Sequence, residues 1–289
     1  MKRALWFLML AAAVPAVAQQ SVDQRRPAEP DGRVVIDNQA GSIRVIGWDQ
    51  NEVAVKGTLG RAAEGLAFKA SGARTEIEVE TRGNPHSTKS DLEIHAPAGS
   101  QVEIDSFSAS ISVSGIKGRV RAESVNASIM LSSVSGEVDA QTVNGGVEVS
   151  GASARVHAES VNGAVMVRGA KGEVEASTVN GTLTVSGGSF ERGHLETVSG
   201  SIEFEGDLAG KGWLDVESVS GDVELRLPAG VSAEFSVSSF SGDIENQLGP
   251  PARKTSRFTS QREVDFMAGA GGMKVSVKTL SGEIRLLKR

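Results

Sequence analysis

Short runs of the chain alternate apolar and polar residues with a period of two. In one run Val156 and Ala158 alternate with charged side chains, and shortly afterwards Val165 and Val167 flank Met166. A period of two places successive side chains on opposite faces of a β-strand, whereas an amphipathic helix needs a period of about 3.6. The spacing predicts pairs of short strands with one buried face and excludes helix for these runs.

The paired strands recur every eighteen residues. Four copies, starting at residues 119, 137, 155 and 173, share a Val-x-Ala run followed by Val-Asn-Gly, which reads Val-Asn-Ala in the first copy. A fixed period of this length indicates units that bury their apolar faces only by stacking on their neighbours. We therefore predict an all-β fold, a single-stranded parallel β-solenoid with coils of about 18–21 residues. We expect a right-handed β-helix because β-crossover-β connections nearly always have that hand.

A glycine-containing tripeptide separates the two strands of each coil. Glycine can adopt positive φ and asparagine tolerates turns, so Val-Asn-Gly predicts a corner. Later in the chain serine replaces the asparagine, at Ser199, Ser220, Ser241 and Ser281. The spacing between successive corners widens there from 18 to about 21 residues. We expect these serines to continue the asparagine column in sequence order.

Outward positions of the repeat carry charges that reverse from coil to coil. Parallel coils lie about 4.8 Å apart, so identical coils would stack like charges on one another. Alternation predicts a ladder of opposite charges and makes 36 residues the full repeat. The first column is Arg119, Glu137, Arg155, Glu173 and Arg192. The second column is Arg121, Asp139, His157, Glu175, His194 and Asp215.

Two polar columns are expected at the corner. Asn126, Asn144, Asn162 and Asn180 should form an amide ladder, as in other stacks with strands in register. A hydroxyl column precedes it at Ser124, Thr142, Ser160, Thr178, Thr197, Ser218, Ser239 and Thr279. These rows could be sugar-binding or ice-binding groups, or an internal ladder whose hydrogen bonds are satisfied at a corner. We favour the internal ladder.

The strict period covers only the middle of the chain. We assign a signal peptide to 1–18, an N-terminal linker to 19–32, N-terminal strands and the cap to 33–100, regular coils to 101–245, and a C-terminal loop, cap strand and last coil to 246–289. Within the N-terminal strands and cap, 33–100, we predict strands at 34–36, 43–46, 53–55, 77–79 and 92–94. Solenoids need atypical, polar end units because an open sheet edge pairs with other chains.

The first residues predict export. Lys2 and Arg3 precede an apolar run, 4–14, and the small residues of 16–18 suit a signal peptidase that cleaves before Gln19. The alternative is an uncleaved anchor, but the run is shorter than the roughly 20 residues that span a bilayer. We expect no transmembrane segment in the mature chain. The predicted location is the periplasm, the cell surface or the medium.

Composition narrows the class further. The chain has 34 glycines, no tyrosine, no cysteine and 4% aromatic residues, which predicts a thin core of small branched side chains without disulfides or a lipid-modified cysteine. A net charge of −6 argues against nucleic acid, whose binders cluster Lys and Arg. No metal-ligand spacing appears, so we predict no metal, cofactor or catalytic residue.

Several motifs resemble a known family. They are the stretch Asp-Asn-Gln-Ala-Gly-Ser-Ile-Arg-Val-Ile-Gly-Trp-Asp at 37–49, the Pro-Ala-Gly corners within 96–99 and 227–230, the repeated Val-Ser/Asn-Gly, and Leu-Ser-Gly-Glu-Ile-Arg at 280–285. With these motifs the chain resembles the exported bacterial putative-adhesin family of β-strand-repeat domains of unknown function. The resemblance implies a β-solenoid of the cell envelope and transfers no catalytic residue. The chain departs from the family at Ala109 and Ala127, which replace the turn glycine.

Carboxylates offer the strongest candidates for catalysis. Asp222, Glu224, Asp243 and Glu245 are expected close together on adjacent coils, where paired carboxylates could divide acid and base roles or bind calcium. They occupy simple alternate outward positions without long loops that would wall a cleft. His157 and His194 are expected to bridge carboxylates of neighbouring coils rather than act as bases.

The sequence therefore predicts a non-catalytic adhesion surface or structural scaffold that contacts an unknown envelope polymer or protein. Two alternatives stay open. One is a carbohydrate-active β-helix enzyme that acts on an envelope or environmental polysaccharide. The other is a scaffold that self-associates end to end. A basic edge at Arg253, Lys254, Arg257 and Arg262 could meet an anionic partner, although a solvated edge strand explains it more simply.

Overall fold

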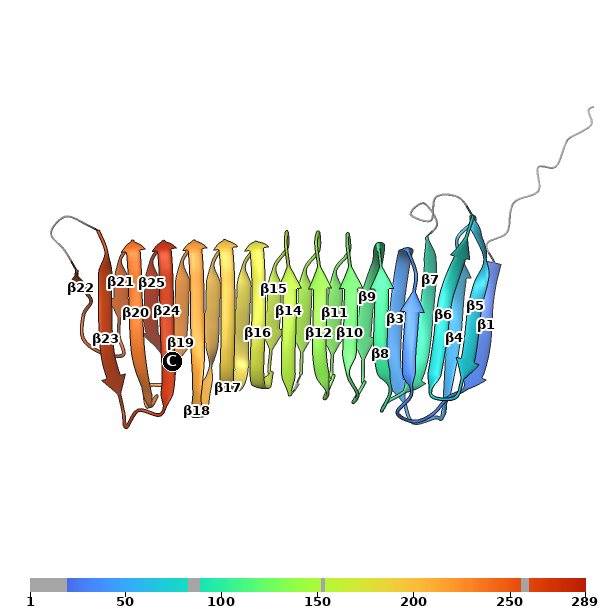
Figure 1. The fold of residues 1–289 in the computed structure, drawn as a ribbon, viewed down its shortest axis with the longest axis horizontal. Coiled ribbons are helices and arrows are strands. Elements are labelled where there is room, and N and C mark those ends of the chain that lie inside the picture. Colours follow the sequence, from blue (N-terminus) through green and yellow to red (C-terminus); the bar gives the residue numbers. More distant parts are fainter. Residues whose placement is uncertain (1–19, 83–88, 152–153, 256–259) are drawn as a thin grey trace, which may run out of the picture.

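The computed structural model describes residues 20–82, 89–151, 154–255 and 260–289. All regular elements in these residues are β-strands, stacked into one elongated rod (Figure 1). The all-β class and the solenoid architecture are confirmed. The predicted signal peptide lies outside the described residues. In the part of the chain described, no helix is long and apolar enough to cross a membrane.

Each central coil contributes one strand to a front sheet, which faces the viewer in Figure 1, and one to a back sheet. Pairing in both sheets is parallel and joins residues one period apart, such as Val120 with Val138 and Ile129 with Val147. The front strands are β8 (Gln101–Ser106), β10 (Val120–Ser124), β12 (Glu137–Thr142), β14 (Arg155–Ser160) and β16 (Lys171–Asn180). The back strands are β9 (Ser108–Ser114), β11 (Ile129–Ser132), β13 (Val147–Ser150) and β15 (Val165–Arg168).

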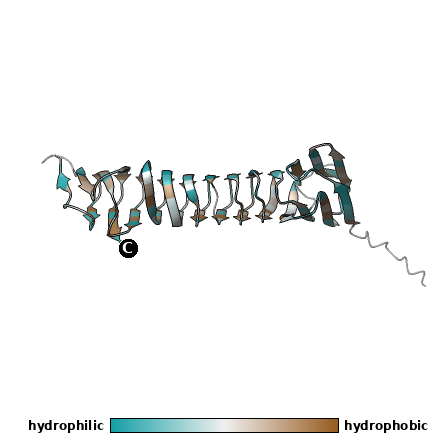
Figure 2. Ribbon diagram, turned by 90° about the horizontal axis from the view of Figure 1, so that it is seen from below, coloured by the Kyte–Doolittle hydropathy of each residue, from teal (hydrophilic) through white to brown (hydrophobic). Residues whose placement is uncertain are grey.

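One apolar core runs between the two sheets, which appear as facing layers when viewed down the strands (Figure 2). Alanine fills one inward column of the central coils, at Ala122, Ala140, Ala158 and Ala176, all fully buried. The column continues with Leu195 and Val216. These lie in β17 (Leu183–Ser199) and β18 (Ile202–Ser220), long strands that begin in the back sheet and end in the front sheet. The coils widen there, and larger side chains fill the added space.

The last coil of the sequence is not the last coil of the rod. It consists of β24 (Met273–Ser281) and β25 (Ile284–Lys288). On one side β24 pairs with β18, and β25 pairs with β19 (Val223–Leu227). On the other side β24 pairs with β20 (Ala233–Ser241), and β25 pairs with β21 (Ile244–Asn246), so the coil lies between these two neighbours (Figure 1). Ser281 therefore stands between Ser220 and Ser241. The serine order expected from the sequence is wrong at this point.

The first coil of the chain is inserted in the same way. It consists of β2 (Arg33–Asp37) and β3 (Ala40–Trp48), which pair inward with β8 and β9. On their outer side they pair with β6 (Arg74–Thr81) and β7 (Ser90–Pro97), which come later in the chain. At both ends, the coil nearest the terminus of the sequence lies one place inside the rod.

Antiparallel strands cover both ends. β4 (Glu52–Leu59) pairs with β7, β1 (Gln20–Pro27) pairs with β4, and β5 (Ala63–Ser71) pairs with β6. At the other end, β23 (Arg262–Ala268) pairs with β20, and β22 (Arg253–Lys254) pairs with β23. The purely parallel sheet predicted from the repeat is therefore wrong at the ends. β1 also forms a strand where the sequence predicted a linker, and the right-handed sense of the coil stays a prediction.

The glycines of the Val-Asn-Gly corners are required for space rather than for φ, whereas Gly200, Gly221 and Gly282 of the Ser-Gly corners do have positive φ. Gly145, Gly163 and Gly181 do not have positive φ, contrary to the sequence interpretation. A Cβ at Gly163 would lie 2.0 Å from the carbonyl oxygen of Gly145 on the coil below. Ala109 and Ala127 also lack positive φ, so these two departures from the glycine pattern need no left-handed backbone.

Candidate functional site

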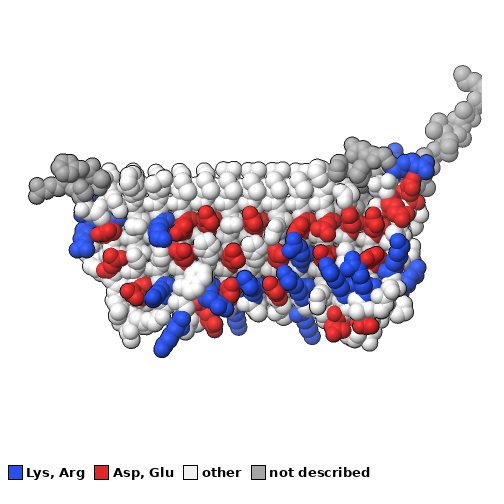
Figure 3. Space-filling view, viewed as in Figure 1, with Lys and Arg blue, Asp and Glu red and all other residues white. Residues whose placement is uncertain are grey.

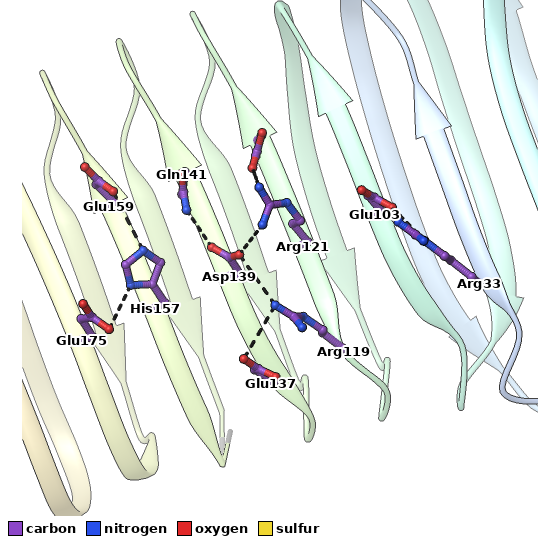
Figure 4. Close-up of polar contacts among 11 residues, drawn as sticks. Arg33, Glu103, Arg119, Arg121, Glu137, Asp139, Gln141, His157, Glu159 and Glu175 are labelled. Atoms are coloured by element: carbon purple, nitrogen blue, oxygen red, sulfur yellow. Dashed lines mark hydrogen bonds and ion pairs between the residues drawn. The ribbon is translucent and has the colours of Figure 1, made fainter.

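The front sheet carries the predicted charge ladder. Arg121 donates a hydrogen bond of 2.9 Å to Asp139, whose side chain is only 11% exposed, and Arg119 lies 3.8 Å from Glu137 (Figure 4). Further along, Glu173 forms ion pairs with Arg155 of the preceding coil at 3.4 Å and with Arg192 of the following coil at 3.0 Å. The strand register places every member of both predicted columns in line. The alternating ladder is confirmed.

Each ladder histidine contacts one of its two expected carboxylates and, in place of the other, a glutamate of its own strand. His157 Nδ1 lies 3.4 Å from Glu175, and its Nε2 lies 3.9 Å from Glu159 on the same strand (Figure 4). Asp139, the expected second partner, is engaged by arginines instead. His194 likewise contacts Asp215 at 3.8 Å and Glu196 of its own strand at 3.7 Å. Each histidine bridges one neighbouring coil rather than two.

The two polar columns at the corner differ in exposure: the asparagines are exposed, whereas the hydroxyl residues are buried. The asparagine side chains donate to one another in series, with Asn144 bonded to Asn126 at 2.8 Å and Asn162 bonded to Asn144 at 2.9 Å. The hydroxyl column is buried, and Thr142 and Ser160 donate to turn carbonyls of the preceding coil. The hydroxyls face the core and form an internal ladder, but those of Ser124, Thr197 and Thr279 have no hydrogen-bond partner among the described residues, so the expected satisfied ladder is confirmed only in part.

The candidate catalytic carboxylates are separated by the inserted coil. Glu224 and Glu245 do not lie on adjacent coils, because Arg285 of β25 pairs between them. Arg285 lies 3.1 Å from Glu224, and Arg262 lies 2.8 Å from Asp243. Asp222 accepts a backbone N–H. The expected cluster is therefore wrong: arginines pair with Glu224 and Asp243, and Glu245 accepts a hydrogen bond from Gln247.

The basic segment near the C-terminus lies at the outer edge of the rod. Arg253 and Lys254 form β22, which pairs with β23 next to Arg262, while Arg257 lies outside the described residues. Among the described residues, no three His, Asp or Glu side chains gather in a way that could hold a metal ion. The basic segment does not form an enclosed site.

An exposed apolar column follows the corner along the rod. We call it the edge ladder, and in spatial order it consists of Phe107, Val125, Val143, Val161, Val179, Val198, Val219, Leu280 and Phe240. Phe107 and Val161 are half-buried, and the other seven rungs are exposed, with exposed fractions between 37% at Val125 and 55% at Phe240. Backbone hydrogen bonds such as Asn144 N–H to Val125 O, 2.8 Å, hold successive rungs together. The sequence interpretation took these valines as parts of a turn, although their alternation with the buried hydroxyl residues places them outside.

A third outward column, the acidic column, runs beside the edge ladder on the front sheet. From the N-terminal end it consists of Glu78, Asp37, Asp105, Glu123, Gln141, Glu159, Ser177, Glu196 and Glu217, and it continues beyond Glu217 with Lys278 and Ser238. Figure 3 shows an uncharged band along the corner and a mainly acidic row directly below it. Burial, followed by the nearby charges of Glu123, Glu103 and Asp37, raises the pKa of Asp105. The acidic column thus does not alternate.

A groove separates the two columns over the central coils. It has a volume of 430 Å³, within the range of ligand pockets, and Asp105, Glu123 and Glu159 line one side while Val125 and Val143 line the other. Carboxylates and valines therefore face the same space. The groove runs across strands, so its lining repeats with every coil.

The back sheet has a separate shallow basin near the N-terminal end. Its volume is 650 Å³, and Ser42, Ser112, Arg44, Lys56 and Met130 are among its lining residues. Short serine side chains lower the floor below the longer side chains at the rim. The basin offers hydroxyl, cationic and apolar groups, but it does not extend along the repeat.

Known proteins were compared with this chain. Residues 170–287 match the model of the family described as Toastrack DUF4097. This part of the chain is similar to that family, and we refer to it as the Toastrack segment. The Toastrack segment contains the wide coils and the inserted C-terminal coil, and the match confirms the resemblance drawn from the sequence. No curated protein matches the sequence.

Three solved structures align with nearly the whole chain, each at 10% identity. A putative adhesin from Bacteroides fragilis has a TM-score of 0.45 and covers 94% of this chain and 99% of its own. A putative adhesin from Parabacteroides distasonis has a TM-score of 0.43, covering 93% and 98%. A putative cell adhesion protein from Clostridium sporogenes has a TM-score of 0.22, covering 93% and 100%.

Proposed function

We propose that this protein is a non-catalytic binding scaffold of the cell envelope that holds an extended partner along its edge ladder. The observation that carries the proposal is a continuous line of apolar side chains, seven of the nine exposed, on a hydrogen-bonded corner. Burying a valine fully contributes roughly 1.5–3 kcal/mol, so a rung that is about 40% exposed leaves about 1 kcal/mol for a partner. Several rungs together would support specific binding.

The absence of catalysis is part of the proposal. Two features support it: the inserted coil separates the candidate carboxylates and arginines pair with Glu224 and Asp243, and the groove is open along the rod rather than walled by loops. Export rests on the segment predicted as a signal peptide. End-to-end self-association stays a separate prediction, and a monomeric sedimentation profile at all concentrations would contradict it.

Matched surface variants test the proposal on glycan and peptide arrays. The ladder variant carries Val143→Ser, Val161→Ser and Val179→Ser, and the control carries Met130→Ser and Met166→Ser on the back sheet. We expect array members bound by the parent protein to lose affinity for the ladder variant, and the control to bind like the parent. Loss confined to the back-sheet variant, or turnover of any glycan, would contradict the proposal.

A further inference from the structure

The acidic column departs from a rule that the same sheet obeys elsewhere. The two neighbouring outward columns alternate in sign, so each charge meets an opposite one on the next coil. In the acidic column, Asp37, Asp105 and Glu123 stack directly on one another. Like charges opposite one another destabilise a sheet. Alternation was available to this chain and is absent from the one column that borders the edge ladder.

Neighbouring side chains neutralise the acidic column only in part. Glu123 is paired with Arg121 and Glu217 with Lys278, which lies at 2.9 Å. Glu159 and Glu196 are met only by histidines, at 3.9 and 3.7 Å, which carry a full charge only when protonated. The column therefore presents net negative charge to the groove at neutral pH. A carboxylate is placed two residues before five of the nine apolar rungs, on the same outward side of the strand, whereas Gln141 and Ser177 precede Val143 and Val179, and Lys278 precedes Leu280.

We propose that the groove takes an extended basic polypeptide segment, with Lys or Arg side chains on the acidic column and apolar side chains on the edge ladder. This inference rests on the proposed function and names the partner of the same surface. Side chains on one side of an extended chain repeat about every 6.7 Å, whereas the coils repeat about every 4.8 Å. Long, flexible cationic side chains accommodate that mismatch.

The same charges disfavour other occupants. A second copy of the chain docked ladder to ladder would bring two acidic columns together. Nucleic acid and anionic lipid surfaces would be repelled by the carboxylates. A cationic glycan would satisfy the charge but would leave the apolar rungs without apolar side chains. A basic polypeptide satisfies both columns.

Labelled synthetic peptides test the partner class by fluorescence anisotropy with the full chain. In the first peptide lysine alternates with valine or leucine; in two matched peptides glutamate or serine replaces every lysine. We expect the lysine peptide to bind at least tenfold more tightly than the other two, and to weaken roughly tenfold or more at high salt. Equal binding of the serine peptide would overturn the basic partner while leaving the edge ladder as a binding surface.

Variants then locate the site. Glu123→Gln, Glu159→Gln and Glu196→Gln together should weaken lysine-peptide binding by about tenfold or more, without a loss of melting temperature. Glu148→Gln, Glu203→Gln and Glu205→Gln remove the same charge from the back sheet and should leave binding unchanged. Equal weakening in both sets would indicate unspecific attraction and overturn the inference. If the lysine peptide binds normally to the ladder variant with three serines, the proposed function fails as well.

Discussion

The central coils and the two ends protect the edges of the same sheets in different ways. In the centre each coil is covered by its sequence neighbours, so order along the chain and order in space agree. At each end the terminal coil lies one place inside, and antiparallel strands form the outer layer. An open parallel edge is a template for pairing with other chains. The ends therefore require long-range pairing that the repeat itself does not need.

The difference also concerns cooperativity. Central contacts join residues one period apart, whereas the hydrogen bond from Lys278 to Glu217 joins residues 61 apart. Closing long loops costs entropy before the contacts form. We infer that the centre can assemble coil by coil, while each end is completed only when its inserted coil is in place. Four predictions test this contrast.

Removing the inserted coil should have the largest effect. Deletion of residues 273–289 takes away β24 and β25, which separate β18 and β19 from β20 and β21. We expect amides in residues 233–268 to lose protection from hydrogen exchange, while residues 120–180 stay protected. Unchanged protection in β20 would mean that β20 can pair directly with β18 and that insertion is dispensable.

Core substitutions should distinguish narrow from wide coils. Leu195→Ala leaves a cavity in a wide coil and should cost about 2–5 kcal/mol of unfolding free energy. Ala158→Leu, one position of the same column in a narrow coil, should cost about 1–3 kcal/mol through overpacking. Denaturant unfolding followed by circular dichroism measures both. A neutral Ala158→Leu would contradict the thin central core.

Deletions within the centre should depend on whether one coil or two are removed. Deleting residues 137–172 places Arg119 beside Glu173 and keeps the alternation, whereas deleting 137–154 places Arg119 beside Arg155. We expect the protein that lacks 137–154 to have a lower free energy of unfolding than the protein that lacks 137–172, by about 1–3 kcal/mol at low salt. The difference should be smaller at high salt. Thermal unfolding at two salt concentrations measures it. If the protein that lacks 137–172 is the less stable of the two, the 36-residue repeat is refuted.

The smallest effect concerns the junction between the inserted coil β2 and the regular coil β8. Burial and the charges of Glu123, Glu103 and Asp37 raise the pKa of Asp105, so the folded protein binds its proton more readily than the unfolded chain. The raised pKa of Asp105 therefore lowers the free energy of unfolding. This destabilisation vanishes below pH 3.8, the ordinary pKa of the carboxyl, and grows as the pH rises through the raised pKa.

Asp105→Asn should therefore increase stability at neutral pH by no more than a few tenths of a kcal/mol, because solvent screens the charges around this partly exposed carboxyl, and should flatten the pH dependence of melting between acidic and neutral pH. Gln141→Asn changes the same column without altering charge and serves as control. A lower melting temperature for Asp105→Asn at pH 7 would contradict the charge argument.

Much of the central architecture could be predicted from the sequence because its determinants are local. The period of Val156 and Ala158, the alternation of Arg119 with Glu137, and the asparagine ladder at Asn144 all depend on the next coil in the chain. The edge ladder could have been found from the same alternation, since Val143 follows the buried Thr142. Its exposure was hidden by treating Val-Asn-Gly only as a turn.

The ends could not be predicted in this way. Sequence periodicity states which strands can pair, and β24 fits the register of both β18 and β20, so it does not decide which coil lies between the others. That choice depends on sealing the sheet edges over the whole rod. It also separates Glu224 from Glu245 and removes the carboxylate cluster that the sequence suggested. The sequence alone determined the coil, its register and its charge ladder through contacts between adjacent repeats; the tertiary structure decided the order of the terminal coils and the surface left for a partner, because both depend on long-range packing.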